Sequence, residues 1–188
     1  MKNIFYLVIL SFLIGGCSYK NEAISLQSYK TQYTGPTAKK QKSVYLKVVQ
    51  DSRMDKRSIG YRLKGSEQST KLYSDANFAD KYKEGLMHAL NIAGFNTDTN
   101  ANDATLVMEV YIKNIEIVYN DKYFDANLKG KMEIDTIVKI GEKVITQNFR
   151  ENETDWIKPS FNSKDLEPFL YRLFSNSINN IIARLTRY

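Results

Sequence analysis

Apolar and polar residues repeat along this chain with different periods, and each period predicts a different kind of element. Residues 4–14 form one apolar stretch, and two later segments repeat apolar residues at the spacing of a helix. Several other segments alternate apolar and polar residues with the period of two that is typical of a strand with one buried face. After the apolar start, we therefore predict the order strand, helix, three strands, helix.

The first helix is predicted over residues 75–93. Seven apolar side chains fall within one arc of the helical wheel: Phe78, Ala79, Tyr82, Leu86, Ala89, Leu90 and Ala93. Asp75 or Asn77 can cap its start, and Gly94 fits the left-handed position that follows a last helical turn. His88 falls on the opposite arc, so we expect it to face solvent.

The last helix has a broader apolar arc than the first. Asn162, Ser163 or Asp165 can cap its start. Its apolar side chains cover about half of the wheel: Leu166, Leu170, Leu173, Phe174, Ile178, Ile181, Ile182 and Leu185. We expect this helix to be covered on two sides, by the sheet and by the first helix.

The first strand is predicted where Val44, Leu46 and Val48 alternate with bulkier or polar residues. The segment Met54–Ser74 that follows is polar, contains two glycines and is predicted to be a long loop. Loops of this length are usually functional or disordered.

A meander of three strands is predicted after the first helix. Alternation runs through Leu106–Ile112 and continues in the opposite phase at Ile115–Ile117, so we expect a bulge near Lys113–Asn114. Residues 128–140 alternate without a break, and a turn leads from them into Val144–Arg150. These strands form an antiparallel sheet with one polar face.

The chain divides into three predicted parts: a cleaved signal peptide at 1–16, a lipidated N-terminus and flexible tether at 17–42, and a single globular domain at 43–188. The brief alternation at residues 23–26 leaves room for an extra edge strand. A right-handed crossover through the first helix places both helices on the same side of the sheet. The predicted fold class is α/β (α+β), a two-layer sandwich in which two helices pack on one face of a four-stranded, mostly antiparallel sheet.

Composition narrows the range of chemistry. The chain of 188 residues has one histidine and one cysteine. Loss of residues 1–16 removes one of its 27 basic residues, which leaves 26 basic against 21 acidic side chains. Because the basic residues are mixed with acidic ones, nucleic acid is not an expected partner. With so few thiols and imidazoles, we predict neither a metal site nor a cofactor.

No group of residues typical of catalysis stands out. The sequence places no nucleophile or carboxylate beside His88. A hydrolase that uses two carboxylates is an alternative, and its candidates lie on predicted strands: Asp51, Glu109, Glu133 and Asp135. Asp51 with Arg53 is more typical of an ion pair that stabilises a turn. We therefore predict that the protein is not an enzyme.

The polar face of the sheet and the aromatic loops are candidate binding surfaces. Amphipathic aromatic side chains at strand ends and in loops favour contacts with proteins or glycans. The candidate residues are Tyr45, Lys47, Tyr111, Lys129 and Lys131 on the sheet face, with Tyr61 and Trp156 in loops.

The first seventeen residues have the parts of an export signal: Lys2, the apolar stretch and two small residues before Cys17. The stretch is too short to remain as a helix across a bilayer. Ile14-Gly15-Gly16-Cys17 resembles the bacterial lipoprotein box, which implies that Cys17 is acylated and that the chain is cleaved before it. Ser18 is not the aspartate that retains lipoproteins in the inner membrane of enteric bacteria. The resemblance therefore implies lipid anchoring in the outer membrane of a Gram-negative bacterium.

Three further motifs accompany this box: Val48–Arg53 after the first strand, Ala93-Gly94-Phe95 at the end of the first helix, and Ser163–Leu166 at the start of the last. With the meander, they resemble the YajG-type family of bacterial outer-membrane lipoproteins. The resemblance implies an envelope lipoprotein without known catalytic residues. The order of elements is also similar to that of small lipoproteins that assist outer-membrane assembly and, more loosely, of lipidated adhesins.

We therefore expect a non-catalytic outer-membrane lipoprotein that acts as a binding or assembly module. Its partners would be the membrane, through the acyl anchor, and an envelope protein, glycan or lipopolysaccharide. The alternative is a surface-exposed adhesin that binds host protein or glycan. Protease treatment of intact cells distinguishes the two, because only an outward-facing domain is cleaved.

Overall fold

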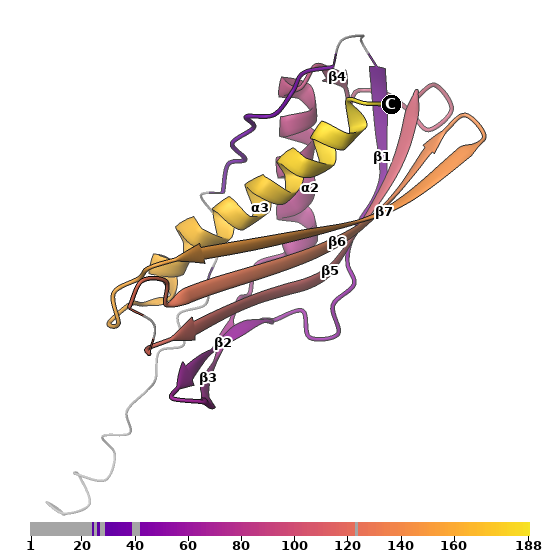
Figure 1. The fold of residues 1–188 in the computed structure, drawn as a ribbon. Coiled ribbons are helices and arrows are strands. Elements are labelled where there is room, and N and C mark those ends of the chain that lie inside the picture. Colours follow the sequence, from indigo (N-terminus) through magenta and orange to yellow (C-terminus); the bar gives the residue numbers. More distant parts are fainter. Residues whose placement is uncertain (1–23, 25, 27–28, 39–41, 123) are drawn as a thin grey trace, which may run out of the picture.

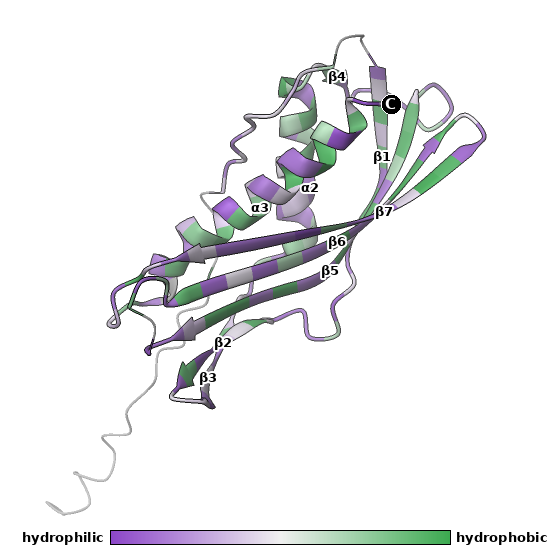
Figure 2. Ribbon diagram, viewed as in Figure 1, coloured by the Kyte–Doolittle hydropathy of each residue, from purple (hydrophilic) through white to green (hydrophobic). Residues whose placement is uncertain are grey.

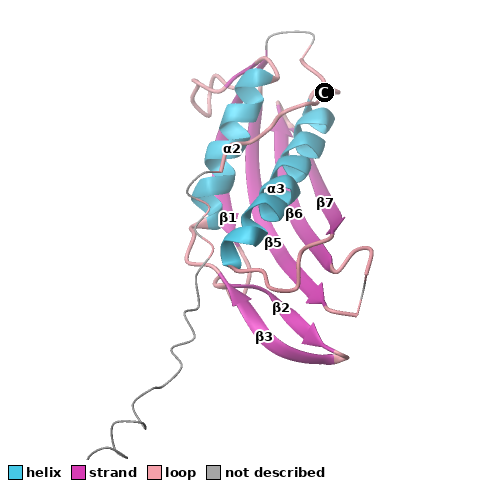
Figure 3. Ribbon diagram, turned by 90° about the vertical axis from the view of Figure 1, so that its left-hand side faces the viewer, coloured by secondary structure: helices cyan, strands magenta, loops and turns pink. Residues whose placement is uncertain are grey.

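The described residues fold into a curved mixed sheet with two helices, α2 and α3, on one of its faces (Figures 1 and 3). The computed structural model describes residues 24, 26, 29–38, 42–122 and 124–188. The elements are β1 (Lys42–Asp51), β2 (Ser58–Lys64), β3 (Glu67–Tyr73), α2 (Phe78–Ile92), β4 (Phe95–Asn96), β5 (Leu106–Asn120), β6 (Leu128–Ile140), β7 (Lys143–Asp155) and α3 (Ser163–Leu185). The mixed α and β content and the two helices are as predicted.

The long strand β5 organises the sheet. One of its edges pairs with β6, which pairs in turn with β7, and its other edge is shared by β1 and β2. β4 adds to β1, and β3 adds to β2. In the described part of the chain the sheet therefore has seven strands, with three parallel and three antiparallel ladders. The expectation of four mostly antiparallel strands was wrong.

The missing strands come mostly from the segment predicted as a loop. β2 and β3 form an antiparallel hairpin, and β2 runs parallel to β5 from Gly60, opposite Ile117, to Leu63, opposite Asn120. β1 already occupies the same edge of β5 up to Ile112. The two strands thus act as one strand interrupted at residues 52–57. β3 lies at the sheet edge with most of its side chains exposed, so it lacks the alternation from which a strand is predicted.

Two bulges determine which side chains of β1 and β5 point toward the helices and which point to the opposite side of the sheet. The predicted bulge in β5 is confirmed, because the register with β6 shifts between Ile112 and Asn114. A second bulge, in β1, was not predicted, and it shifts the register with β5 between Leu46 and Val48. Val48 is therefore opposite Glu109 on the outer face, and Val49 packs against the core in its place. The expected inward position of Val48 was wrong.

The helices begin and end close to their predicted limits. Asn77 caps α2 by accepting a hydrogen bond from the backbone of Asp80, and Gly94 after its last turn has a φ of 87°, which glycine adopts without strain. α3 begins with a capping box between Asn162 and Asp165. The apolar sides of both helices and the inner sides of β5 and β6 form the core, and the alternation along these strands is visible in Figure 2.

The N-terminal segment, meaning described residues 24, 26 and 29–38, packs on the domain rather than extending from it as part of a tether. Ile24 is buried and bridges Ser74 just before α2, and Tyr29 stacks edge-on against Phe174 with ring centroids 5.6 Å apart. At its far end, the backbone N–H of Ala38 donates to Ala93. The segment thus crosses both helices, from the end where they begin to the end where they finish.

This finding corrects the expected tether over residues 17–42 for its described part. Ile24, Leu26 and Tyr29 are buried, although too few apolar residues lie near them in sequence to form a recognisable period. Their contacts are with residues far along the chain. Cys17 and the signal peptide lie outside the described residues. Among the residues that are described, no helix has both the length and the apolar character needed to cross a bilayer.

Candidate functional site

Six of the seven predicted binding residues lie on the outer face, the face of the sheet opposite the helices. Register pairs place Tyr45 beside Val107, Tyr111 beside Asp135, and Tyr61 with Lys129 on either side of Val118. Lys47 and Lys131 share this face, because they form ion pairs with Glu109 and Glu133, whose side chains point outward. Trp156 does not, since it follows the end of β7 in the loop before α3. The candidates therefore spread along the sheet and form no single cluster.

The charged groups of the outer face satisfy one another. Lys47 Nζ lies 2.6 Å from Glu109 Oε1, and the Tyr111 hydroxyl donates to Glu109 Oε2 at 2.6 Å. The hydrogen bond from Lys47, followed by that from Tyr111, lowers the pKa of Glu109, and the same bonds raise the pKa of Lys47 and of Tyr111. These three side chains thus bond to one another, and the charges of Lys47 and Glu109 balance within the group.

A second set of charged groups lies on β6 and β7. Glu133 contacts Lys131 at 2.9 Å and Arg150 at 3.4 Å, and Asn148 donates to Asp135 at 2.8 Å. Exposed pairs of this kind contribute little to stability, but they neutralise the charge that a ligand would otherwise find. The outer face is consequently a weak candidate for binding a charged partner.

A stronger candidate lies on the helix side, between β7 and α3. Three polar pairs join these elements: Asp155 with Arg172, Glu153 with Asn176, and Glu151 with Asn180. They form a ladder because two residues of a strand rise about 6.7 Å and four residues of a helix rise about 6 Å. Strand and helix run in opposite directions, so the two sets of positions stay in step.

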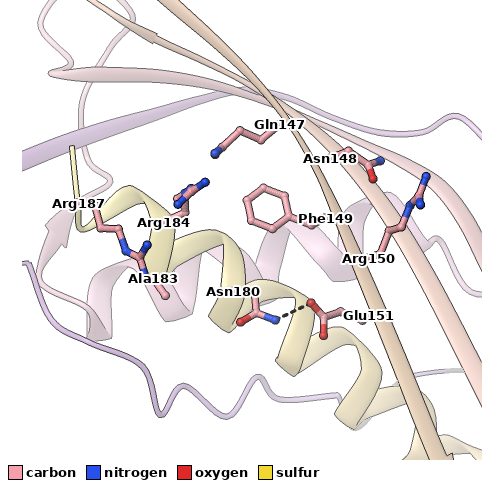
Figure 4. Close-up of a pocket in the computed structure, with 9 residues that line it drawn as sticks. All are labelled: Gln147, Asn148, Phe149, Arg150, Glu151, Asn180, Ala183, Arg184 and Arg187. Atoms are coloured by element: carbon pink, nitrogen blue, oxygen red, sulfur yellow. Dashed lines mark hydrogen bonds between the residues drawn. The ribbon is translucent and has the colours of Figure 1, made fainter.

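The ladder stops at its next position, where Phe149 and Arg184 would meet. There the two elements enclose a groove of about 350 Å³. Its lining residues are Gln147, Asn148, Phe149, Arg150, Glu151, Asn180, Ala183, Arg184 and Arg187. Figure 4 shows Phe149 pointing from β7 toward α3, with Arg184 and Arg187 on the helix side and Arg150 turned away on the far side of the strand. We call this the arginine groove.

The groove carries positive charge without an internal counterion. Arg184 and Arg187 make no ion pair with the described residues, whereas Arg150 contacts Glu133 on the other face. The acidic side chain in the groove lining is that of Glu151, and it accepts a hydrogen bond from Asn180 at 2.6 Å. Burial raises the pKa of Glu151, which disfavours its charged form. The groove therefore suits an anionic group.

The free edge of β7 borders the arginine groove. Among the described residues β7 pairs with β6 alone, so the N–H and C=O groups that every second residue of this 13-residue strand directs to the other edge have no strand partner. The strand contains no proline, and its hairpin partner β6 holds it in register over its full length. A long, regular edge of this kind can accept a further strand.

Sequence reasoning did not find the groove. Its residues come from β7 and from the C-terminal part of the chain around α3, which are far apart in sequence. All but Phe149 and Ala183 are polar, so a search for apolar periods does not identify them. One signal was available, since Arg172, Asn176, Asn180 and Arg184 recur at four-residue intervals beside the apolar arc of the last helix. A polar stripe at that position predicts a helix edge that faces a polar strand.

The carboxylates considered for hydrolysis all have partners. Asp51 receives two hydrogen bonds from the Arg53 guanidinium, at 2.9 and 2.7 Å, and both side chains are buried. The ion pair predicted between these residues is confirmed. His88 is exposed on α2, as predicted. Across the described ranges, no group of three or more potential metal ligands lies together.

These features define a mixed α+β domain whose seven-stranded sheet carries two helices on one face. The chain belongs to a family of bacterial lipoproteins described as uncharacterized, whose sequence profile matches residues 32–183. Membership of a lipoprotein family implies attachment to a membrane through a lipid. No curated protein matches the chain.

One solved structure shows a similar fold. The protein is similar to XCC0632 from Xanthomonas campestris, with a TM-score of 0.58, 11% identity, and coverage of 84% of this chain and 93% of that one. A lower similarity, with a TM-score of 0.44 and 13% identity, relates it to the hypothetical protein CT253 from Chlamydia trachomatis, over 78% of this chain and 97% of that one. At such identities the first of these likenesses concerns the fold alone.

Proposed function

We propose that this protein is a non-catalytic, lipid-anchored binding module of the outer membrane that holds an envelope partner protein by an extended acidic segment of that partner. The segment lies along β7, and its acidic side chains enter the arginine groove. One observation carries this proposal. In the part of the chain that the structure describes, a strand edge without a strand partner and two arginines without an acidic partner meet in a single groove.

A peptide fits this groove better than a glycan or a lipopolysaccharide. The arginines would accept a carboxylate or a phosphate equally well. Only a peptide strand, however, also satisfies the alternating N–H and C=O groups along the edge of β7. In an added strand, every second side chain faces the same way, so acidic residues at alternate positions would reach Arg184 and Arg187.

The anchor belongs to the same proposal. The Ile14–Cys17 motif, the serine after it and the lipoprotein family support acylation of Cys17 and an outer-membrane location. We retain the YajG-type assignment as part of this proposal. The absence of catalysis is likewise proposed, and it is supported by the engagement of Asp51, Glu109, Glu133 and Asp135 in hydrogen bonds or ion pairs.

Site-specific photo-cross-linking in the bacterium that makes this protein tests the proposal. A photoreactive phenylalanine analogue replaces Gln147, which lines the groove, in the full-length lipidated chain. Irradiation is expected to yield one discrete adduct with an envelope protein, and mass spectrometry of the adduct is expected to place an acidic segment of that protein at the cross-link. The same analogue at Tyr45, on the outer face, is expected to yield none.

Charge reversal supplies the matched control. Arg184→Glu with Arg187→Glu is expected to abolish the adduct. Lys83→Glu with Lys139→Glu makes the same change in net charge at exposed positions away from the groove and is expected to leave the adduct intact. An adduct that survives reversal of the two arginines, or that forms from Tyr45 instead, would overturn the groove as the binding site.

Protease treatment of intact cells separates this proposal from the adhesin alternative. A module that serves an envelope partner on the periplasmic side is expected to survive the treatment. Removal of the domain would favour the surface adhesin.

A further inference from the structure

Two large aromatic side chains are exposed at one end of the molecule. Phe124, in the turn between β5 and β6, is 88% exposed, and Trp156, in the loop between β7 and α3, is 55% exposed. Figure 1 places this turn and this loop together at the end of the sheet from which α3 begins. We call the described residues of the two connections, 121–122, 124–127 and 156–162, the loop pair.

The loop pair is held firmly by the side chains beneath it. The Asn127 side chain donates to the carbonyl of Ile157 at 2.6 Å and accepts from its N–H at 2.8 Å, so the two connections are tied to each other. The Arg62 guanidinium lies 3.8 Å from the centroid of the Phe161 ring and donates to the Phe161 carbonyl at 3.0 Å. The exposed aromatic side chains therefore sit on a fixed support.

The N-terminal segment approaches from the same end of the molecule. It runs from Ile24, beside Ser74, to Ala38, beside Ala93, and so travels in the direction of α2. Ile24, the first described residue of the segment, therefore lies on the side on which the helices begin, which is also the side of the loop pair (Figure 3).

The distance from Ile24 to an anchor on Cys17 is short. Seven residue steps separate Cys17 from Ile24, and a fully extended chain of that length spans at most about 25 Å. Ile24 lies beside Ser74, next to Tyr73, which is opposite Ser58, two residues before the Gly60 that faces Ile117. From that level to the end of β5 at Asn120 the strand runs about five residues, or about 17 Å, which is less than the reach of the chain. A lipid on Cys17 thus keeps the bilayer surface within reach of the loop pair.

We infer that the loop pair rests on the bilayer that holds the anchor, with Phe124 and Trp156 in the interfacial layer of the phospholipids. This inference depends on the acylation of Cys17 within the proposed function. Tryptophan favours this layer because its ring is apolar while its N–H remains available to water or head groups. The acyl chains supply the membrane affinity, and the two rings set the orientation of the domain.

The single tryptophan of the chain makes the contact measurable. The full-length lipidated protein is reconstituted into vesicles of phosphatidylethanolamine and phosphatidylglycerol, with and without bromine on the acyl chains. Bromine quenches a tryptophan that lies in the bilayer. We expect Trp156 emission to fall in the brominated vesicles, and to lie at shorter wavelength than in a protein made without residues 1–17, which has neither the acyl chains nor the apolar stretch.

A second reporter tests the orientation with the same anchor. Val144 is 60% exposed at the turn between β6 and β7, the opposite end of the sheet. With Trp156→Phe and Val144→Trp combined, the emission is expected to be equal in brominated and plain vesicles. Phe124→Ser in the otherwise unchanged chain is expected to lessen the quenching of Trp156 without releasing the protein from the vesicles.

The outcomes separate this inference from the proposed function. A chain that does not float with the vesicles lacks its anchor, which overturns the proposed function and this inference together. A chain that floats but shows an unquenched Trp156, or equal quenching at Val144→Trp, overturns the orientation alone. The cross-linking experiment on β7 is unaffected by either result, because the groove lies along the side of the sheet.

Discussion

Arg53 stabilises the segment that connects β1 to β2. Its guanidinium makes two bonds to Asp51, one to the carbonyl of Ser58 at 2.8 Å and one to that of Lys56 at 2.6 Å. It also stacks on Phe78, with 4.7 Å to the ring centroid. Each of the three guanidinium nitrogens thus donates to a partner, and residues 52–57 wrap around the side chain.

Arg53→Met is expected to lower the free energy of unfolding by about 3–5 kcal/mol, because it leaves the buried carboxylate of Asp51 without its counterion. Urea denaturation measures the loss. Arg57→Met is the matched control, since Arg57 pairs with Asp75 on the exposed surface, and it is expected to cost about 1 kcal/mol or less. Equal losses in the two variants would contradict the role given to Arg53.

Two buried tyrosines, Tyr82 and Tyr119, differ in whether the hydroxyl group has a hydrogen-bond partner. The hydroxyl of Tyr82 lies 2.9 Å from Ser177 Oγ, whereas the buried hydroxyl of Tyr119 has no hydrogen-bond partner among the described residues. Tyr82→Phe is expected to cost about 0.5–1.5 kcal/mol, the usual net value of a hydrogen bond. Tyr119→Phe removes an unsatisfied polar atom, so it is expected to be neutral or stabilising.

Thermal unfolding of both variants checks this pair of expectations. The two substitutions remove the same atom from the same residue type, so the packing change is matched. A loss at Tyr119 as large as that at Tyr82 would show that the Tyr119 hydroxyl has a partner not seen here.

The packing of the N-terminal segment against α2 depends on a glycine of that helix. A Cβ at Gly85 would lie 2.2 Å from Thr31 Oγ1 and 2.8 Å from Tyr29 Cε1, too close for either to stay in place. The absence of a side chain there lets the segment lie against the helix. Glycine is otherwise unfavourable inside a helix by about 1 kcal/mol relative to alanine.

Gly85→Ala is therefore expected to retain α2 but to displace residues 29–38. Limited trypsin digestion reads this out, because Lys30 lies in the segment and becomes cleavable when the segment lifts. His88→Ala, on the exposed side of the same helix, is expected to leave the digestion pattern unchanged. A Gly85→Ala protein as resistant at Lys30 as the unmodified one would contradict the close contact.

The elements that could be predicted are those in which one strand or helix face is buried along its whole length. α2, α3, β5 and β6 have this property, and the bulge near Lys113–Asn114 follows from the change of phase within β5. β7 is half-buried on its inner side, and only its first part, Val144–Arg150, was predicted. The hairpin of β2 and β3 has too little buried surface to leave a pattern. The bulge in β1 was missed because Val48 and Val49 are adjacent valines, and either could point inward.

The candidate site was harder to predict than the fold. Residues of the outer face were placed correctly for Tyr45, Lys47, Tyr111, Lys129 and Lys131, because alternation assigns each to a face. What sequence could not supply was the pairing across strands, by which Lys47 and Glu109 neutralise each other. The arginine groove likewise depends on how α3 lies against β7, and only the three-dimensional arrangement determines that.

For the whole molecule, the proposed contacts occupy separate surfaces. The arginine groove runs along the side of the sheet at β7, and the loop pair forms one end of it. If the loop pair rests on the bilayer, the free edge of β7 stays accessible to a neighbouring protein close to the membrane. The outer face, with its internally balanced charges, remains in water in this arrangement.

The direction of the N-terminal segment also affects how the fold would respond to a mechanical load. Tension on the lipid would act along the N-terminal segment, parallel to the helices it crosses. Its contacts with Ser74, Phe174 and Ala93 would then be strained together, in shear, instead of being peeled away one after another. The fold is thus arranged to transmit a pull from the membrane to its core without unravelling from the tethered end.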